Sequence, residues 1–252
     1  MLRIAAAGDI HCSPAERARI ENAFGSLDSA VDVVLLAGDL TTHGAPEEAA
    51  VLADVCRGVA QPVFAVLGNH DWHIDRAGEV IAVLEDAGIH VLERRAEICT
   101  VDASRVGVAG VKGFVGGFPD AALPDFGEPS LRRVYAETTE EVEALDRGLR
   151  EIDDCDLRIA LLHYAPTTST LGSEPRGIWA FLGSDRLARP ILDHTPDLVL
   201  HGHAHAGTFE GFLGPVPVYN VALHVTGRDF WIFELEPGRE PELEREPEPP
   251  AV

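Results

Sequence analysis

Five short apolar runs, each ending at a cluster of polar residues, constrain the fold of this chain more than any other feature. The runs are rich in branched aliphatic residues and lack the alternation of a half-exposed strand, a pattern typical of parallel strands buried on both faces. They occupy residues 2–7, 33–37, 63–67, 159–162 and 198–200. Segments typical of helices separate several of them, including residues 137–151 with a charged outer face, so we predict an α/β fold.

Polar clusters follow each of these runs, at the predicted carboxyl ends of the strands. In an extended strand, side chains two residues apart share a face, so a D-x-H or H-x-H motif is expected to direct two ligands to one place. Carboxylate, imidazole and carboxamide groups without a thiolate favour divalent Mn, Fe, Zn, Ni or Co. A single G-D or G-N would indicate only a polar turn, but five clusters in series predict one metal site. In order they are Asp9-Ile10-His11, Gly38-Asp39, Gly68-Asn69-His70-Asp71, His163 and Gly202-His203-Ala204-His205.

This series of motifs resembles the signature of the calcineurin-like metallophosphoesterase superfamily, and the chain is similar to its small bacterial phosphodiesterase-type members. The signature runs D-x-H, G-D, G-N-H-[D/E], H and G-H-x-H, and the match extends from Asp9 to His205. The resemblance implies a four-layer α/β/β/α sandwich of two mixed sheets flanked by helices, with a dinuclear metal centre at the strand ends. Asp71 departs from many members, which have Glu there.

The resemblance also implies a role for each motif residue. Two divalent or mixed-valence metal ions are the implied cofactors, and His70 is the implied general acid or phosphate contact. Asp71 either orients His70 or is a carboxylate that supports the turn. The implied ligands are Asp9, His11 and His205 for one metal, Asn69, His163 and His203 for the other, and Asp39 as the bridge between them.

The predicted activity is that of a metal-dependent phosphoric ester hydrolase. We expect a small phosphodiester substrate, with a cyclic nucleotide as one candidate, hydrolysed by in-line attack of a metal-bridging hydroxide. A phosphomonoesterase or protein phosphatase of the same fold is the alternative. A nuclease is less favoured, because a chain with net charge −22 and a single lysine, Lys112, has little means of neutralising a nucleic-acid backbone. A noncatalytic scaffold is also less favoured, since it would be expected to lose ligands and His70 is present.

Four further residues are candidate substrate contacts. His43 and His73 closely follow predicted ligand loops, and Arg176 and Trp179 lie in a long loop after His163. Arg176 is suited to pairing with a phosphate and Trp179 to stacking on a ring. The alternative for Trp179 is that it anchors its own loop against the body of the protein.

Three more polar residues are expected to act outside the ligand set. His201 shares the parity of the H-x-H motif but lies deeper in its strand, so we predict a satisfied interior residue. His224 is expected to be structural or exposed. Asn220, at the end of an apolar segment, is expected to support the site by hydrogen bonding.

The chain is expected to form one catalytic domain over residues 1–235, followed by an acidic, proline-rich tail over residues 236–252 that is too polar to fold. The mean hydropathy is +0.03, which argues against membrane spans. The first apolar run is too short for a signal-peptide core and leads directly into Asp9, so we expect a cytoplasmic protein. Four cysteines without C-x-x-C spacing fit that compartment. A homo-oligomer is compatible with the sequence.

Overall fold

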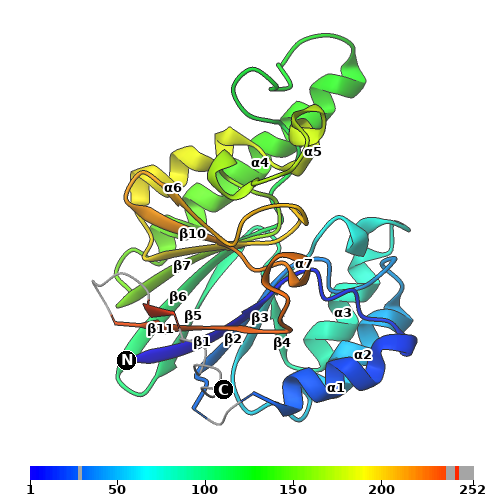
Figure 1. The fold of residues 1–252 in the computed structure, drawn as a ribbon, viewed down its shortest axis with the longest axis vertical. Coiled ribbons are helices and arrows are strands. Elements are labelled where there is room, and N and C mark those ends of the chain that lie inside the picture. Colours follow the sequence, from blue (N-terminus) through cyan, green and yellow to red (C-terminus); the bar gives the residue numbers. More distant parts are fainter. Residues whose placement is uncertain (28–29, 237–241, 244–252) are drawn as a thin grey trace, which may run out of the picture.

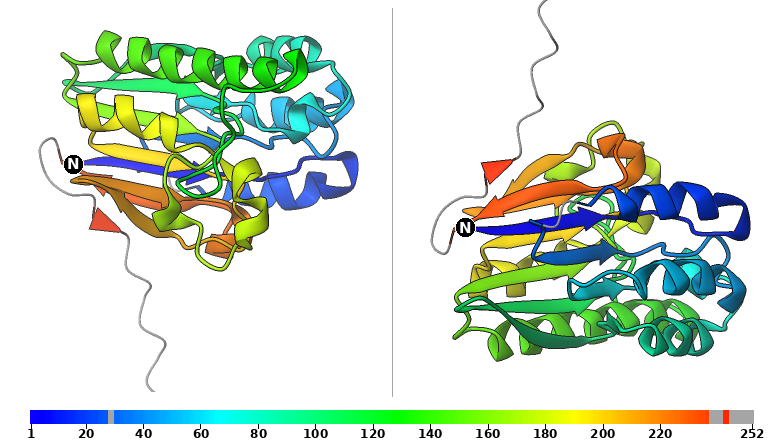
Figure 2. Two further views of the ribbon diagram at one scale, coloured as in Figure 1. Left: turned by 90° about the horizontal axis from the view of Figure 1, so that it is seen from above. Right: turned by 90° about the horizontal axis from the view of Figure 1, so that it is seen from below.

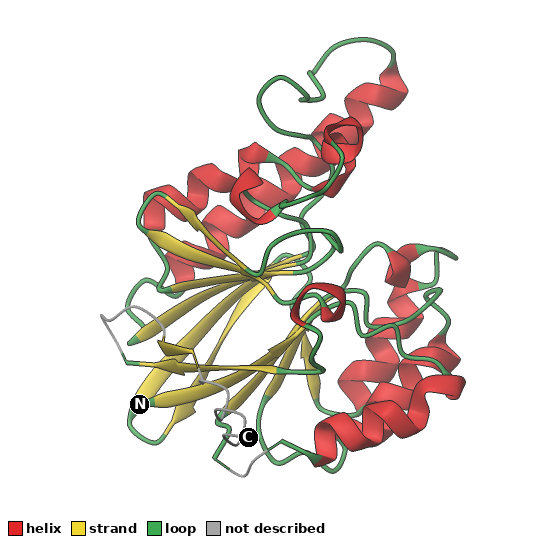
Figure 3. Ribbon diagram, in the orientation of Figure 1, coloured by secondary structure: helices red, strands yellow, loops and turns green. Residues whose placement is uncertain are grey.

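Two six-stranded sheets pack face to face, and helices cover both outer faces (Figure 1, Figure 3). The computed structural model describes residues 1–27, 30–236 and 242–243. The predicted four-layer α/β/β/α sandwich is therefore confirmed.

The first sheet contains the first three apolar runs as parallel strands. Its order is β12-β11-β1-β2-β3-β4, with β11 antiparallel to β1 and β12 antiparallel to β11. The two-residue strand β12 falls within the predicted tail. Residues 237–241 and 244–252 of that tail lie outside the described residues. The strands are β1 Leu2–Ala7, β2 Val33–Ala37, β3 Val63–Val66, β4 Ile89–Val91, β11 Trp231–Leu235 and β12 Glu242–Leu243.

The second sheet contains the other two apolar runs, β7 and β8. Its order is β5-β6-β7-β8-β10-β9; the four central strands are parallel and the two edge strands, β5 and β9, are antiparallel to their neighbours. All five predicted strands are confirmed. The strands are β5 Arg95–Val101, β6 Ser104–Val111, β7 Leu157–Leu162, β8 Leu198–His201, β9 Glu210–Leu213 and β10 Val216–Asn220.

Helices cover the outer face of each sheet (Figure 2). α1, α2 and α3 pack on the first sheet, and α4 and α6 pack on the second. No helix in the described part of the chain combines the length and apolar character needed to span a bilayer. The helices are α1 Arg17–Gly25, α2 Pro46–Cys56, α3 Ala77–Asp86, α4 Pro129–Glu151, α5 Trp179–Leu182, α6 Ala188–His194 and α7 Leu223–Thr226.

Helix α4 is longer than the sequence predicted. The apolar pattern indicates a helix over residues 137–151, but the helix begins at Pro129, which favours a first-turn position. The buried residues of α4 begin only at Thr138, so its first turns project beyond the core, and their apolar side chains, Leu131, Val134 and Tyr135, are exposed or half-buried. This projecting end later forms one wall of a cavity beside the site.

The space between the two sheets is filled by large side chains from both. Phe233 on β11 is fully buried there, and its ring lies 4.9 Å from that of Tyr219 on β10, measured between centroids. The ring centroid of Phe209 lies 6.3 Å from that of Phe233. This aromatic contact joins β11 of the first sheet to the second sheet.

Phe233→Ala should lower the free energy of unfolding by about 3–5 kcal/mol, because it leaves a cavity between the sheets. Urea denaturation followed by circular dichroism measures this. The control is Phe212→Ala, on edge strand β9, where the side chain is 50% exposed and the expected change is within about 0.5 kcal/mol. Equal effects of the two substitutions would contradict the central role of Phe233.

Candidate metal centre

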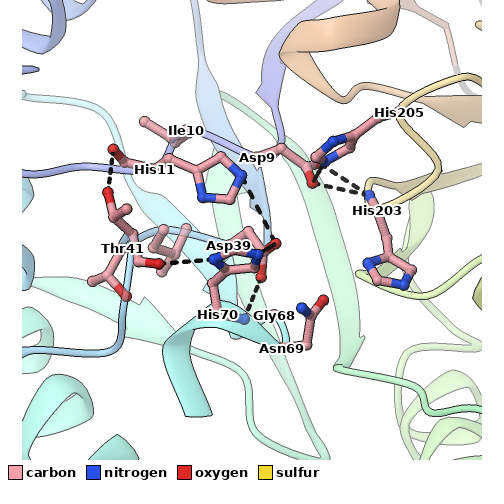
Figure 4. A network of polar contacts seen from close by, with 12 residues as sticks. Asp9, Ile10, His11, Asp39, Thr41, Gly68, Asn69, His70, His203 and His205 are labelled. Atoms are coloured by element: carbon pink, nitrogen blue, oxygen red, sulfur yellow. Dashed lines mark hydrogen bonds and ion pairs between the residues drawn. The ribbon is translucent and has the colours of Figure 1, made fainter. Parts of the chain in front are cut away.

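The predicted ligands converge at the carboxyl ends of the central strands. Strands β1, β2, β3, β7 and β8 all end just before or within a polar cluster, and the loops that follow meet at one edge of the sandwich (Figure 4). Asn69 joins the cluster through His163, with 2.9 Å between its Oδ1 and the Nε2 of His163. The structure therefore gathers every predicted ligand. Three groups have candidate ligand atoms within 4.8 Å of one another: Asp9, His11 and His205; His11, Asp39 and His70; and Asp39, His163 and His203.

The geometric reason given for the D-x-H and H-x-H motifs is wrong. Strand β1 ends at Ala7, so the Asp9–His11 pair is not on an extended strand. Asp9 and His11 have φ angles of 55° and 48°, and Asp39 and His203 have φ angles of 49° and 70°. A left-handed conformation at a non-glycine residue costs about 1–3 kcal/mol and tends to occur at functional sites. Tight turns, rather than strand parity, direct these side chains to one place.

Glycines in the motifs clear space for the ligands. A Cβ atom on Gly38, which has a φ of 83°, would lie 2.5 Å from Nδ1 of His163. A Cβ atom on Gly68 would overlap the Asp39 carboxylate and lie 2.8 Å from Cε1 of His163. Gly202 similarly leaves room for the carboxylate of Asp9. The glycines of G-D, G-N and G-H are therefore required by contact with the ligands.

Backbone carbonyls set the orientation of three histidine rings. His163 donates from Nδ1 to the oxygen of Ala37 at 3.0 Å, and His203 donates from Nε2 to the oxygen of Phe181 at 3.0 Å. His70 donates from Nδ1 to the oxygen of Thr42 at 2.8 Å. A carbonyl only accepts, so each bond assigns the proton and leaves the other ring nitrogen with a lone pair.

The donor set around His163 fits a bound cation. Burial lowers the pKa of His163, so its ring carries one proton, and that proton faces Ala37. The Nε2 lone pair then faces two other acceptors, Oδ1 of Asn69 at 2.9 Å and Oδ1 of Asp39 at 3.4 Å. Acceptor atoms this close repel unless a positive charge lies among them. A divalent metal supplies that charge and matches these ligand types.

Two buried carboxylates add to the need for a cation. Asp9 and Asp39 are 0% and 1% exposed. Burial and the nearby charge of Asp9 raise the pKa of Asp39. Burial alone would raise the pKa of Asp9 as well, but hydrogen bonds from His205 Nε2 at 2.7 Å and the backbone N–H of His203 at 2.9 Å outweigh it and lower the pKa. Two negative charges in one buried site are stable when metal ions neutralise them.

Asp71 connects the loops that carry Asp39 and Asn69. Its carboxylate accepts hydrogen bonds from the backbone N–H groups of Leu40 at 3.1 Å, Thr41 at 2.8 Å and Gly68 at 2.8 Å, and from the hydroxyl of Thr41 at 2.6 Å. The side chain is fully buried. Of the two roles predicted for Asp71, support of the turn matches these contacts.

The four candidate substrate contacts fall in different places. The ring of His73 lies 4.3 Å from that of His70, so it borders the site. The side chain of His43 is 68% exposed, and its Nδ1 lies 3.0 Å from Oε1 of Glu48. Arg176 lies over the ring of Trp179 at 5.1 Å, and Trp179 Nε1 donates to the oxygen of Glu174 at 3.0 Å. The contacts of Trp179 match those of a loop anchor.

Two further polar residues have hydrogen-bond partners that match their predicted roles. His201 is buried and its Nε2 lies 2.8 Å from the hydroxyl of Thr170, so it is a satisfied interior residue. Asn220 donates to the oxygen of Ala204, at 2.8 Å, inside the H-x-H loop.

His224 is a site neighbour that the sequence did not reveal. Its ring stacks on His205 with centroids 4.1 Å apart and an interplanar angle of 13°, and it lies 6.3 Å from His11. No motif surrounds it. The available signal was topological: strand β10 is parallel to β8, so the segment after β10 emerges at the same edge as the ligands.

Comparison with known proteins identifies the family. A family model described as calcineurin-like phosphoesterase matches residues 2–207. The chain belongs to this family. It is a metal-dependent phosphoester hydrolase, in agreement with the sequence prediction. A search of curated proteins gives no match to the chain.

Solved structures support the phosphoesterase fold at low sequence identity. Phosphopantetheinyl hydrolase from Mycobacterium tuberculosis has a TM-score of 0.60 at 17% identity, over 87% of this chain and 88% of its own. A putative 5'-nucleotidase from Staphylococcus aureus has a TM-score of 0.58 at 15% identity, over 96% of this chain and 52% of its own. GAP50, the anchor in the inner membrane complex of Plasmodium, has a TM-score of 0.57 at 14% identity, over 93% of this chain and 81% of its own.

Asp39→Ala should remove metal from both halves of the site and abolish phosphoester hydrolysis, because both groups of ligands face this carboxylate. Elemental analysis of the purified variant measures the metal content. The control is Asp193→Ala, an exposed position on α6 that pairs with Arg189 at 3.5 Å. Full metal content in the Asp39 variant would contradict the bridging role.

Gly68→Ala should lower metal affinity about 10–100-fold, because the added methyl group displaces Asp39 or His163. Titration with Mn²⁺, followed by calorimetry, measures the affinity. Gly78→Ala on α3 is a matched control, since a Cβ there meets nothing within 4 Å and stability should be unchanged or higher by up to about 1 kcal/mol. Unchanged affinity in the Gly68 variant would show that the loop can absorb the methyl group.

Proposed function

We propose that this phosphoesterase uses a dinuclear metal centre to hydrolyse small phosphodiesters. The observation that carries the proposal is the position of Asp39 between two groups of ligands. Its Oδ1 lies 3.4 Å from Nε2 of His163, in the group that also contains Asn69 and His203. Its Oδ2 lies 3.9 Å from Nε2 of His11, in the other group. One carboxylate with an oxygen toward each group is the arrangement expected of a bridging ligand.

The two groups of ligands have complementary compositions. Asp9, His11 and His205 offer one carboxylate and two imidazoles, and Asn69, His163 and His203 offer one carboxamide and two imidazoles. Such sets suit Mn, Fe, Zn, Ni or Co, and the supply in the cell decides among them. When bound, the metals would supply the positive charge that activates a water molecule and offsets the charge of the phosphoryl oxygens.

His70 is positioned to transfer a proton at this site. The bond from its Nδ1 to Thr42 leaves Nε2 directed inward, 3.9 Å from Oδ2 of Asp39. When Nε2 is protonated it can donate to the departing oxygen of the ester, which otherwise leaves as an unstable alkoxide. The neighbouring rings of His73 and His11, with centroids 4.3 Å and 4.6 Å away, limit the motion of His70.

Asp71 acts in this proposal as a positioning residue. It holds the turn before Leu40 and the turn at Gly68 together and so fixes the separation between Asp39 and Asn69. Among the other predicted contacts, His73 has the position to meet substrate. Arg176 and Trp179 stabilise the loop whose Phe181 oxygen orients His203.

A diester is favoured over a monoester by the surroundings of the centre. The clustered ligands include no lysine or arginine, so two metals would carry the positive charge, which suits the single negative charge of a diester. A cavity of about 490 Å³ also opens beside Asn69 and gives space for a second ester group. A phosphomonoesterase or protein phosphatase remains the alternative, and the substrate comparison below separates the two classes.

The Mn²⁺-loaded protein should hydrolyse bis-p-nitrophenyl phosphate with a kcat/KM at least about tenfold above that for p-nitrophenyl phosphate, because the diester can keep one ester group in the adjacent cavity while the other leaves. Release of p-nitrophenolate measures both reactions. The reverse preference would assign a phosphomonoesterase. Metal binding without hydrolysis of either ester would contradict the enzymatic proposal and favour a scaffold.

His70→Ala should retain the metals and lower kcat about 100-fold for a methyl ester but only about tenfold for a p-nitrophenyl ester, since p-nitrophenolate needs no proton to leave. Single-turnover rates on the two diesters measure the difference. The control, His90→Ala, removes a histidine on β4 that pairs with Glu97 at 2.6 Å and should change neither rate. Equal losses for the two leaving groups would exclude His70 as the acid.

A further inference from the structure

The cavity beside Asn69 is joined directly to the metal ligands. It has an aromatic wall, formed by Trp72, Phe114 and Tyr164, and a second wall formed by the first turns of α4. Trp72 belongs to the same short helix as His70, and Tyr164 follows His163. A group attached to a phosphate at the centre can therefore enter this cavity without crossing the body of the protein.

Lys112, which also lines the cavity, contacts two rings of the aromatic wall. The Nζ atom of Lys112 lies 4.3 Å from the ring centroid of Phe114 and 5.5 Å from that of Tyr164. Lys112 is only 6% exposed, and its backbone oxygen accepts the N–H groups of His163 and Tyr164 at 3.1 Å and 3.0 Å. The only lysine of the chain thus fixes two rings of the cavity relative to a metal ligand. Ordered aromatic surfaces of this kind are suited to a planar group.

The charges on the cavity wall are unequally paired. Glu137 forms an ion pair with Arg94. Burial lowers the pKa of Lys112, and the charges of Glu141 and Glu93 partly oppose that change. Arg133, on α4, contacts the hydroxyl of Ser130 at 3.1 Å and has no carboxylate partner among residues 1–27 and 30–236. The guanidinium is available to a carboxylate or phosphate.

We propose that this cavity selects phosphodiesters in which one ester group combines a planar ring with an additional anionic group. The inference rests on the proposed function, because the phosphate must lie at the metal centre. The ring would lie against Phe114 and Tyr164 with Trp72 covering its exposed side, and the anionic group would bind Arg133. A cationic ester group would meet repulsion from Arg133 and Lys112, so the cavity discriminates by charge as well as by shape.

Binding of non-hydrolysable phosphonates tests the proposal directly. Calorimetry with Mn²⁺-loaded protein compares methylphosphonate, phenylphosphonate, 4-phosphonobenzoate and its longer homologue 4-(phosphonomethyl)benzoate. The phenyl ring should tighten binding about tenfold relative to methyl, as expected for burying one aromatic face. Of the two carboxylated compounds, the one whose carboxylate reaches Arg133 should bind about threefold more tightly than phenylphosphonate, as expected for an ion pair near the surface.

Two variants identify the source of each gain. Arg133→Ala should remove the gain from the carboxylate. Arg132→Ala, one position earlier on α4, should leave all affinities unchanged, since Arg132 bonds to Asp125 at 3.1 Å outside the cavity. Phe114→Ala should reduce the gain from the ring, and the unchanged unfolding midpoint of each variant confirms that the fold is intact.

The outcomes separate this inference from the proposed function. Equal affinities for methyl, phenyl and carboxylated phosphonates, in a protein that hydrolyses diesters, would overturn the cavity proposal and leave the phosphodiesterase proposal intact. A carboxylate gain that survives Arg133→Ala would overturn the assignment of the anion site. Failure to bind methylphosphonate, together with failure to hydrolyse diesters, would overturn the proposed function itself.

Discussion

The close approach of Asp9 and Asp39 is the constraint on which the rest of the site depends. Both carboxylates are almost completely buried, and the charge of Asp9 helps to raise the pKa of Asp39. Backbone N–H groups and imidazoles stabilise part of this charge, but the imidazoles also present lone pairs of their own. These buried charges and lone pairs are balanced only when cations lie among them. Metal binding is therefore linked to formation of the loops at the carboxyl ends of the central strands.

The backbone around these carboxylates is arranged at some energetic cost. Asp9, His11, Asp39 and His203 adopt left-handed conformations that the surrounding structure must maintain. Hydrogen bonds from two loops to Asp71 and the close packing at Gly38 supply part of that restraint. The sandwich itself is built from regular strands, and four of the nine left-handed non-glycine residues in the described part of the chain are predicted ligands.

Much of the fold and of the ligand set could be predicted from sequence. Buried parallel strands have a composition that differs from helices and turns, so the five apolar runs were recognisable. The D-x-H to G-H-x-H series then identified the candidate ligands, although the strand-parity argument for their convergence failed because β1 ends at Ala7. Local pattern does not encode left-handed turns at non-glycine residues, and it did not reveal the exposed first turns of α4 or the stacking of His224 on His205.

The position of Lys112 has a practical consequence. The chain has one side-chain amine, and it lies against two aromatic rings that border the cluster of candidate metal ligands. Isotopic labelling of lysine would therefore give one ε-methylene signal in a nuclear magnetic resonance spectrum, free of overlap and shifted by ring currents from Phe114. Its chemical shift would report the orientation of that ring in solution without any engineered probe.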